Sequence, residues 1–92
     1  MESAVKNLYY VEITDMFGGE ANYSWLTRHV VRAKSERGAV NAMSRRSGMN
    51  WRYDGLKYLS KSGATCMFID MYDEEYHADY TFNSDDRKES EK

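Results

Sequence analysis

Proline is absent from this 92-residue chain, and cysteine occurs only once, at Cys66. A lone cysteine excludes an intrachain disulfide. No apolar run approaches the roughly eighteen residues of a membrane-spanning helix, so we expect no membrane segment and no membrane partner. The first residues lack the charged stretch and apolar run of a secretory signal. These absences, together with the short length, favour a single domain in the cytoplasm.

Leucine and isoleucine are also scarce, and aromatic side chains take their place. The chain has eight tyrosines, three phenylalanines and two tryptophans. Tyrosine offers a large apolar ring while its hydroxyl tolerates water, so tyrosine-rich proteins often keep aromatic surface exposed. We therefore expect part of the aromatic surface to remain available for a partner.

The net charge of −2 conceals a segregation of charges along the chain. Residues 1–26 carry −3, residues 27–62 carry +7, and residues 63–92 carry −6. One interpretation is that the acidic ends lie beside the basic middle in the fold and neutralise it. The alternative is a dipolar surface, with a basic face for an anionic partner or an acidic face for a basic partner.

One segment has the pattern of a capped amphipathic helix. Ser35 is a suitable N-cap, and Gly48 can adopt the left-handed conformation that ends a helix. Between them Ala39, Val40, Ala42 and Met43 recur on one face, which predicts a buried stripe. Since an isolated helix of this length is marginal, we expect the stripe to pack on a sheet.

The rest of the chain reads as strands and turns. Alternating apolar and polar residues predict strands at residues 8–14, 22–33, 51–60, 64–72 and 76–82, with a loop at 15–21. Residues 51–60 are either one kinked strand or two short ones, because Asp54-Gly55 favours a turn. Tyr9, Val11 and Ile13 should face the helix. In residues 22–33, which have room for a bulge, we favour the parity of Trp25, Val31 and Ala33 for the buried side.

The predicted fold is therefore α+β, a small antiparallel sheet of order β-β-α-β-β-β with one helix packed on one face. Residues 1–82 form the domain, with residues 76–82 forming a hairpin with 64–72, and residues 83–92 are expected to be a disordered charged tail. One helix leaves the other sheet face partly uncovered. That face and a free sheet edge could also support a homodimer.

No motif in the sequence indicates catalysis. Glu75, His77 and Asp79 share a parity and could ligate zinc, but no spacing signal supplies a fourth ligand. Cys66 lies in the most apolar strand, where a free cysteine usually packs as a small hydrophobe. The Gly18-Gly19 pair lacks the spacing and the lysine of a phosphate-binding loop. We predict no catalytic residue, no metal and no cofactor, and hence a protein that is not an enzyme.

Two surfaces are candidates for binding. The first is acidic and aromatic, suits a basic protein groove by imitating phosphates, and consists of Tyr72, Asp73, Glu74, Glu75, Tyr76, Asp79 and Tyr80. The second interleaves cations and rings as single-strand binders do, and consists of Arg28, Arg32, Arg37, Arg45, Arg46, Trp51 and Arg52. The acidic pI near 5.6 argues against the second. Binding of a protein is thus the leading hypothesis, and binding of nucleic acid is the alternative.

Three runs carry a resemblance that covers most of the chain, LYYVEITDMFGGEANYSW, RHVVRAKSERGAV and SGATCMFIDMYDEEYHADY. They resemble small accessory proteins encoded by bacteriophages and prophages. The resemblance implies a bacterial cytoplasmic setting and a protein that binds and blocks a host protein, restriction or CRISPR machinery included. It assigns no site residue.

Overall fold

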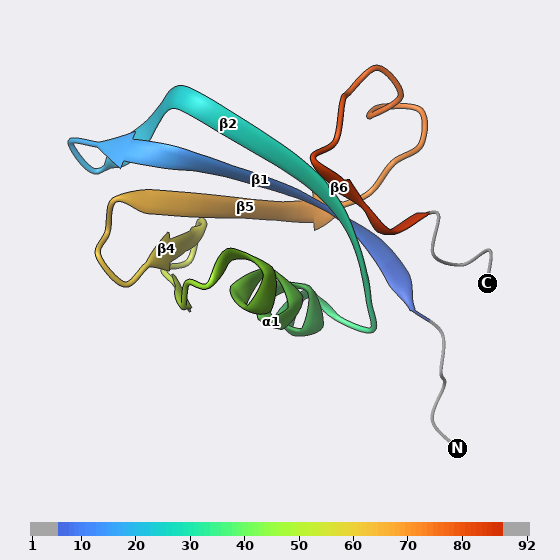
Figure 1. The fold of residues 1–92 in the computed structure, drawn as a ribbon, viewed down its shortest axis with the longest axis horizontal. Coiled ribbons are helices and arrows are strands. Elements are labelled where there is room, and N and C mark those ends of the chain that lie inside the picture. Colours follow the sequence, from blue (N-terminus) through green and yellow to red (C-terminus); the bar gives the residue numbers. More distant parts are fainter. Residues whose placement is uncertain (1–5, 88–92) are drawn as a thin grey trace.

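The computed structural model describes residues 6–87, which form a six-stranded sheet with one helix across one face (Figure 1). The elements are β1 (Asn7–Phe17), β2 (Glu20–Ala33), α1 (Glu36–Ser47), β3 (Trp51–Tyr53), β4 (Tyr58–Ser60), β5 (Thr65–Met71) and β6 (Ser84–Asp85). The strand order is β3-β4-β5-β1-β2-β6. The α+β class is confirmed, but the sheet is mixed, because β6 runs parallel to β2 while the other neighbours are antiparallel.

The helix forms where its end signals predict it. The Ser35 hydroxyl accepts a hydrogen bond from the Gly38 amide at 3.1 Å, and Gly48 closes the helix at φ +73°. Ala39, Val40, Ala42 and Met43 are all buried. The caps satisfy backbone groups that a helix leaves unpaired at its ends, so short-range chemistry sets both boundaries.

The main core lies between this helix and one face of the sheet. Tyr9, Val11 and Ile13 of β1 belong to it, as predicted, together with Val31 and Ala33 of β2, Met67 of β5 and the buried stripe of α1. The predicted parity near the helix is therefore confirmed for Val31 and Ala33, whereas Trp25 at the far end of β2 is 44% exposed.

The loop predicted at residues 15–21 is wrong. Strands β1 and β2 continue to Phe17 and from Glu20, and only Gly18 and Gly19 make the turn, both at positive φ. Glycine takes that conformation without a steric penalty, so the hairpin needs just two residues. The predicted bulge in β2 is present. The register passes from Thr14↔Leu26 to Met16↔Ala21.

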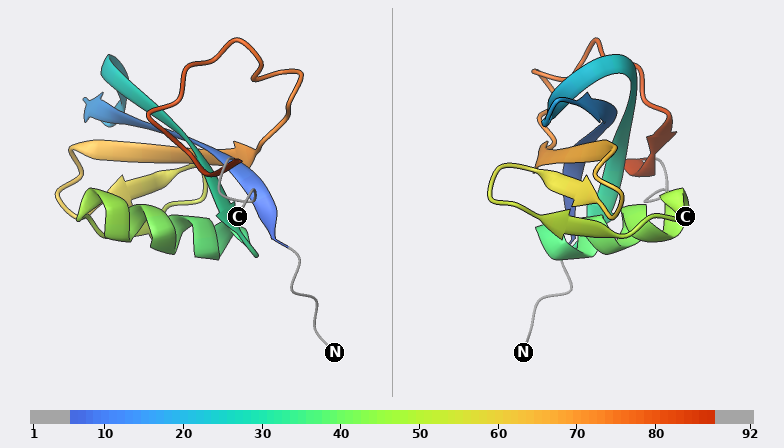
Figure 2. Two further views of the ribbon diagram at one scale, coloured as in Figure 1. Left: turned by 45° about the vertical axis from the view of Figure 1, so that its right-hand side comes forward. Right: turned by 90° about the vertical axis from the view of Figure 1, so that its left-hand side faces the viewer.

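Residues 51–60 form two short strands, β3 and β4, which pair as a hairpin around the Asp54 turn. The Asp54 carboxylate accepts from the amides of Leu56 and Lys57 at 2.9 and 2.8 Å, and this capping favours two strands over one kinked strand. Figure 2 shows this hairpin beside the helix at one end of the molecule. Within residues 6–87, no helix is long and apolar enough to cross a membrane.

The strand predicted at residues 76–82 is also wrong. Residues 74–79 are a series of turns, and residues 72–82, which we call the lobe, form a loop between β5 and β6. The hairpin predicted between residues 64–72 and 76–82 is therefore absent, and β5 pairs with β1 and β4 instead. Tyr76, Ala78, Tyr80 and Phe82 alternate as they would in a strand, but the Asp73 carboxylate accepts hydrogen bonds from the Glu75 and Tyr76 amides. These bonds compete with strand pairing and turn the chain.

The tail predicted at residues 83–92 begins too early. Ser84 and Asp85 pair with β2, and Asp86 is only 6% exposed. Residues 88–92 of that prediction lie outside the described residues.

The sheet face away from the helix is partly covered by the lobe, which rises over it in Figure 1. Large exposed apolar side chains are scattered rather than gathered on that face, as shown by Phe17, Tyr23, Trp25, Tyr53 and Tyr76. On that face the Tyr10 ring packs against His77, Tyr80 and Phe82 of the lobe.

Candidate functional site

The lobe is built around a buried histidine. His77 is 3% exposed and stacks on Tyr10 of β1, with ring centroids 4.1 Å apart and an interplanar angle of 15°. Tyr72 lies near-parallel to the same imidazole at 5.5 Å and 22°, and Tyr80 meets it edge-on at 5.3 Å. Aromatic pairs at these separations add stability beyond the area they bury. The imidazole therefore anchors the lobe to the sheet.

Hydrogen bonds join this anchor to the backbone of the lobe. The Asp73 amide donates to His77 Nδ1 at 2.9 Å, and the His77 amide donates to the Asp73 carbonyl at 2.9 Å. The Asp73 carboxylate accepts from the amides of Glu75 and Tyr76 at 2.9 and 3.1 Å. Because Nδ1 accepts, the ring proton of a neutral His77 is on Nε2. Asp73 thus acts as the cap that shapes the turn.

The base of the lobe consists of Tyr72, Tyr80 and Phe82, where the lobe meets the sheet. Arg28 of β2 contacts this base on one side. Its guanidinium lies over the Tyr80 ring, 4.4 Å from the centroid, and its Nε donates to the Tyr10 hydroxyl at 2.9 Å. That hydroxyl donates in turn to Glu12 at 2.7 Å. Burial and the bond to Glu12 raise the pKa of Tyr10, so its hydroxyl stays protonated and keeps donating.

Arg87 closes the base on the other side. Its guanidinium donates to the Asp85 carboxylate and, at 2.5 Å, to the Tyr72 hydroxyl. It also lies 5.1 and 5.2 Å from the ring centroids of Tyr72 and Phe82. Both ends of the lobe are therefore fixed by cations that stack on its rings.

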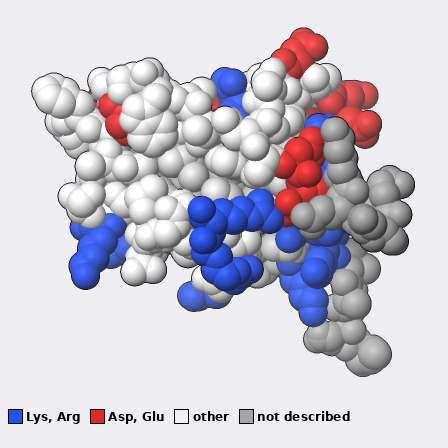
Figure 3. Space-filling view, viewed as in Figure 1, with Lys and Arg blue, Asp and Glu red and all other residues white. Residues whose placement is uncertain are grey.

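The lobe displays acidic side chains around one exposed ring. Glu74, Glu75 and Asp79 are exposed, and Tyr76 is 72% exposed. No cation within residues 6–87 lies within 4.0 Å of these three carboxylates. Figure 3 shows acidic atoms at this end of the molecule and basic atoms mainly along the helix side.

The seven residues predicted for protein binding are thus together, but they do not share one role. Glu74, Glu75, Tyr76 and Asp79 face solvent. Asp73 caps the turn, and Tyr72 and Tyr80 are half-buried in the base. Tyr72, Asp73 and Tyr80 also make contacts within the protein, through the Tyr72 hydroxyl, the Asp73 carboxylate and the Tyr80 ring, and their contact with a partner stays a prediction.

The seven residues predicted for nucleic-acid binding are not gathered. Arg28 and Arg52 lie on the sheet face away from the helix by strand alternation, while Arg37, Arg45 and Arg46 project from α1. Trp51 packs against the core. The set as predicted therefore does not form one continuous surface.

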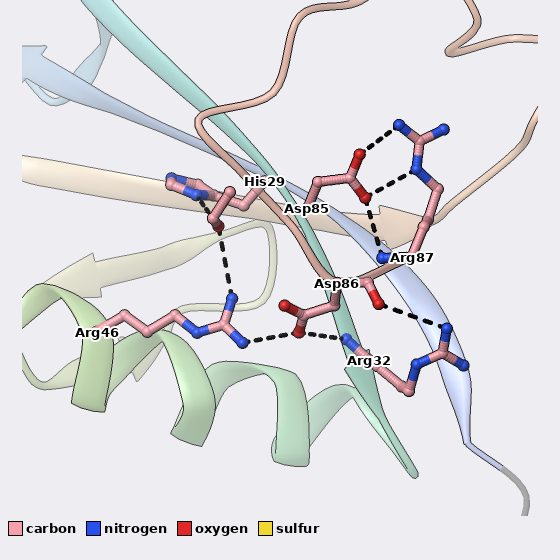
Figure 4. Close-up of polar contacts among 7 residues, drawn as sticks. His29, Arg32, Arg46, Asp85, Asp86 and Arg87 are labelled. Atoms are coloured by element: carbon pink, nitrogen blue, oxygen red, sulfur yellow. Dashed lines mark hydrogen bonds and ion pairs between the residues drawn. The ribbon is translucent and has the colours of Figure 1, made fainter. Parts of the chain in front are cut away.

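A third feature was not predicted from the sequence, because it includes Asp86, in the segment expected to be a disordered tail. The Asp86 carboxylate accepts from Arg46 Nη2 at 2.7 Å and from the Arg32 amide at 3.0 Å (Figure 4). His29 lies beside this cluster and bonds Ser84 through Nδ1 at 2.7 Å. Burial, and secondarily Arg46, lower the pKa of His29, so its neutral form is favoured. The sequence signal for this cluster was the acidic charge of residues 63–92 beside the basic charge of residues 27–62. Asp86 and Arg46 carry these opposite charges and neutralise each other here.

The structure gives no support for a metal or a reactive thiol. His77 points into the sheet, away from the exposed Glu75 and Asp79, and residues 6–87 contain no group of three His, Cys, Asp or Glu side chains placed to hold a metal ion. Cys66 is fully buried, and this burial raises the pKa of its thiol. A protonated, inaccessible thiol is a poor nucleophile.

Comparison with protein-family models, with curated proteins and with solved structures gives no match. The functional argument therefore rests on the geometry of the molecule.

Proposed function

We propose that this chain is a non-enzymatic interaction protein whose lobe binds a basic surface on another protein. The observation that carries the proposal is the anchoring of the lobe by His77, which presents Glu74, Glu75, Tyr76 and Asp79 on a fixed support. A surface that is already ordered loses little conformational entropy when it binds.

The chemistry of the exposed side chains specifies the partner. Three exposed carboxylates that have no cation partner among residues 6–87 favour association with a positively charged surface and speed the encounter. Tyrosine is among the residues that most often dominate binding energy at interfaces. Together with the resemblance to phage accessory proteins, this chemistry favours a host protein whose basic groove accepts nucleic-acid phosphates.

The test uses single substitutions of exposed lobe residues, of which Tyr76 also meets the His77 ring edge-on at 5.0 Å. Glu75→Lys and Tyr76→Ala alter exposed side chains, whereas Glu20→Lys makes the same charge change in the β1-β2 hairpin. A partner isolated from bacterial lysate with the unmodified protein would be purified, and its affinity for each variant measured by biolayer interferometry. Tyr76→Ala should weaken binding by roughly 30-fold, the effect typical of a central tyrosine.

Glu75→Lys should also weaken binding, and its effect should shrink as salt is raised because the charges are exposed. Glu20→Lys should bind as the unmodified protein does. Equal affinities for all three variants would remove the lobe from the interface. Steeply salt-dependent binding of single-stranded nucleic acid at sub-micromolar concentration would favour the nucleic-acid alternative instead.

A further inference from the structure

A second candidate site lies at the other end of the molecule from the lobe, between the first half of α1 and the β3-β4 hairpin. These elements are adjacent in the right-hand view of Figure 2. They enclose a cavity of about 270 Å³ lined by Arg37, Val40, Asn41, Trp51, Tyr53 and Tyr58. Nothing in the proposed protein interaction uses this cavity.

Tyr53 and Tyr58 form an aromatic wall of the cavity, and Val40 and Trp51 connect the cavity to the core. Tyr53 and Tyr58 pack with centroids 4.9 Å apart, and Tyr53 is 59% exposed, so one ring is accessible at the entrance. Val40 is buried in the core and Trp51 packs against it. The Tyr58 hydroxyl donates to Glu36 at 2.7 Å, which fixes the ring. Burial and this bond raise the pKa of Tyr58 to about 12, so its ring remains neutral near pH 7.

The polar side of the cavity comes from two helix residues one turn apart. Arg37 and Asn41 are exposed and lie on the same helix face. Among the described residues, neither side chain has a hydrogen-bond or ion-pair partner within the protein. Trp51 Nε1 is buried and also lacks a partner there. A buried donor without an acceptor is uncommon in folded proteins.

We propose that this cavity binds a nucleotide. The base would stack on the exposed Tyr53 ring, the phosphate would meet the Arg37 guanidinium, and the Asn41 amide would pair with a base edge. Asparagine can donate and accept together, which matches the adjacent donor and acceptor of adenine. The Arg37 guanidinium disfavours a cationic ligand, and no carboxylate is among the described residues that line the cavity. A free mononucleotide and one nucleotide of a single strand share this chemistry.

The two indole signals of the ¹⁵N-labelled protein provide the measurement, because the chain has two tryptophans. Trp25→Phe assigns them. Titration with AMP should shift the Trp51 indole signal saturably, since Trp51 lines the cavity, and should leave the Trp25 signal in place. A Trp51 signal that does not move at millimolar AMP would overturn the proposal.

Variants then test each contact. Tyr53→Ala and Arg37→Gln should each weaken AMP binding about tenfold, from lost stacking and a lost charge-assisted bond respectively. Lys34→Gln removes the same charge from an exposed residue that does not line the cavity, and it should bind AMP normally. Equal affinity of Tyr53→Ala and the unmodified protein, or equal binding of ribose phosphate and AMP, would refute a stacked base.

A titration with oligoadenylate shows whether the cavity takes a free nucleotide or one nucleotide of a single strand. Much tighter binding of the oligoadenylate than of AMP would support a strand-derived nucleotide, and similar affinity would support a free one. The lobe variant Glu75→Lys should leave AMP binding unchanged. Failure of this inference is therefore separable from failure of the protein-binding proposal.

Discussion

Removal of the His77 ring is expected to detach the lobe from the sheet. In His77→Ala the two stacked contacts with Tyr10 and Tyr72 are lost, at about 0.5–1.5 kcal/mol each. The amide of Asp73 also loses its acceptor, which costs about 1 kcal/mol more. The variant should therefore be less stable by about 3 kcal/mol.

For a domain of this size, 1 kcal/mol corresponds to about 4–8 °C in Tm, so His77→Ala should melt about 12 °C or more below the unmodified protein. His77→Phe keeps an aromatic ring but cannot accept from Asp73, and it should lose only about 1 kcal/mol. Glu74→Ala is the control, because Glu74 is an exposed residue of the same loop and its loss should cost less than about 0.5 kcal/mol. Thermal denaturation followed by circular dichroism measures all three.

Hydrogen exchange locates the loss within the fold. The amides of His77 and Tyr80 bond carbonyls inside the lobe, at Asp73 and His77, and they should exchange faster in His77→Ala. Amides of β1 that pair with β2 and β5 should remain protected. A Tm within about 4 °C of the unmodified protein, with lobe amides still protected, would refute the anchoring role of the ring.

Three further substitutions test other parts of the fold. Hydrogen bonds from Ser24 and Asn22 hold the pKa of Asp15 well below its usual range. The ionised carboxylate therefore stabilises the folded protein above about pH 4, and this contribution is lost as the pH falls further. The Tm of Asp15→Asn should depend less on pH below about 4. Gly48→Ala should cost about 1 kcal/mol in urea denaturation because its φ is +73°, and Gly48→Asn should cost less. Asp86→Ala should cost about 2–3 kcal/mol in urea denaturation, because it leaves the Arg32 amide and Arg46 unpaired.

Each of these has a contrary outcome. Parallel pH profiles for Asp15→Asn and the unmodified protein would show that the ionised Asp15 carboxylate does not contribute to stability. Equal costs for alanine and asparagine at position 48 would remove the conformational argument. An Asp86→Ala variant as stable as Arg46→Ala, whose side chain is 36% exposed in the ion pair, would show that the buried carboxylate adds nothing beyond a surface pair.

The strand predicted at residues 76–82 was misplaced for a physical reason. Residues 76–82 alternate as a strand does, yet the bonds of the Asp73 carboxylate to two following amides turn the chain first. Aspartate favours turns in any sequence. Here the turn at Asp73 prevails over the strand-like alternation because His77, which follows the turn, stacks on Tyr10 of β1. The alternation of residues 76–82 carries no information about the Tyr10 ring, which lies in a distant part of the sequence.

The candidate sites divide in the same way. The acidic display of Glu74, Glu75, Tyr76 and Asp79 was predicted because these residues are neighbours in sequence, so any fold of the segment keeps them together. The cavity of Arg37, Asn41, Trp51, Tyr53 and Tyr58 joins a helix to a hairpin, and only packing brings these side chains to one place.

The amino-acid sequence by itself determined the helix with its Ser35 and Gly48 caps, the buried stripe, the strand parity of β1 and the α+β class. These features follow from interactions between residues a few positions apart, where spacing along the chain fixes spacing in the fold. Tertiary structure alone decided that residues 72–82 form a lobe and that Ser84 and Asp85 join the sheet. Asp86 meets the Arg32 amide 54 residues away in the chain, and such a pairing exists only after the intervening strands have folded together.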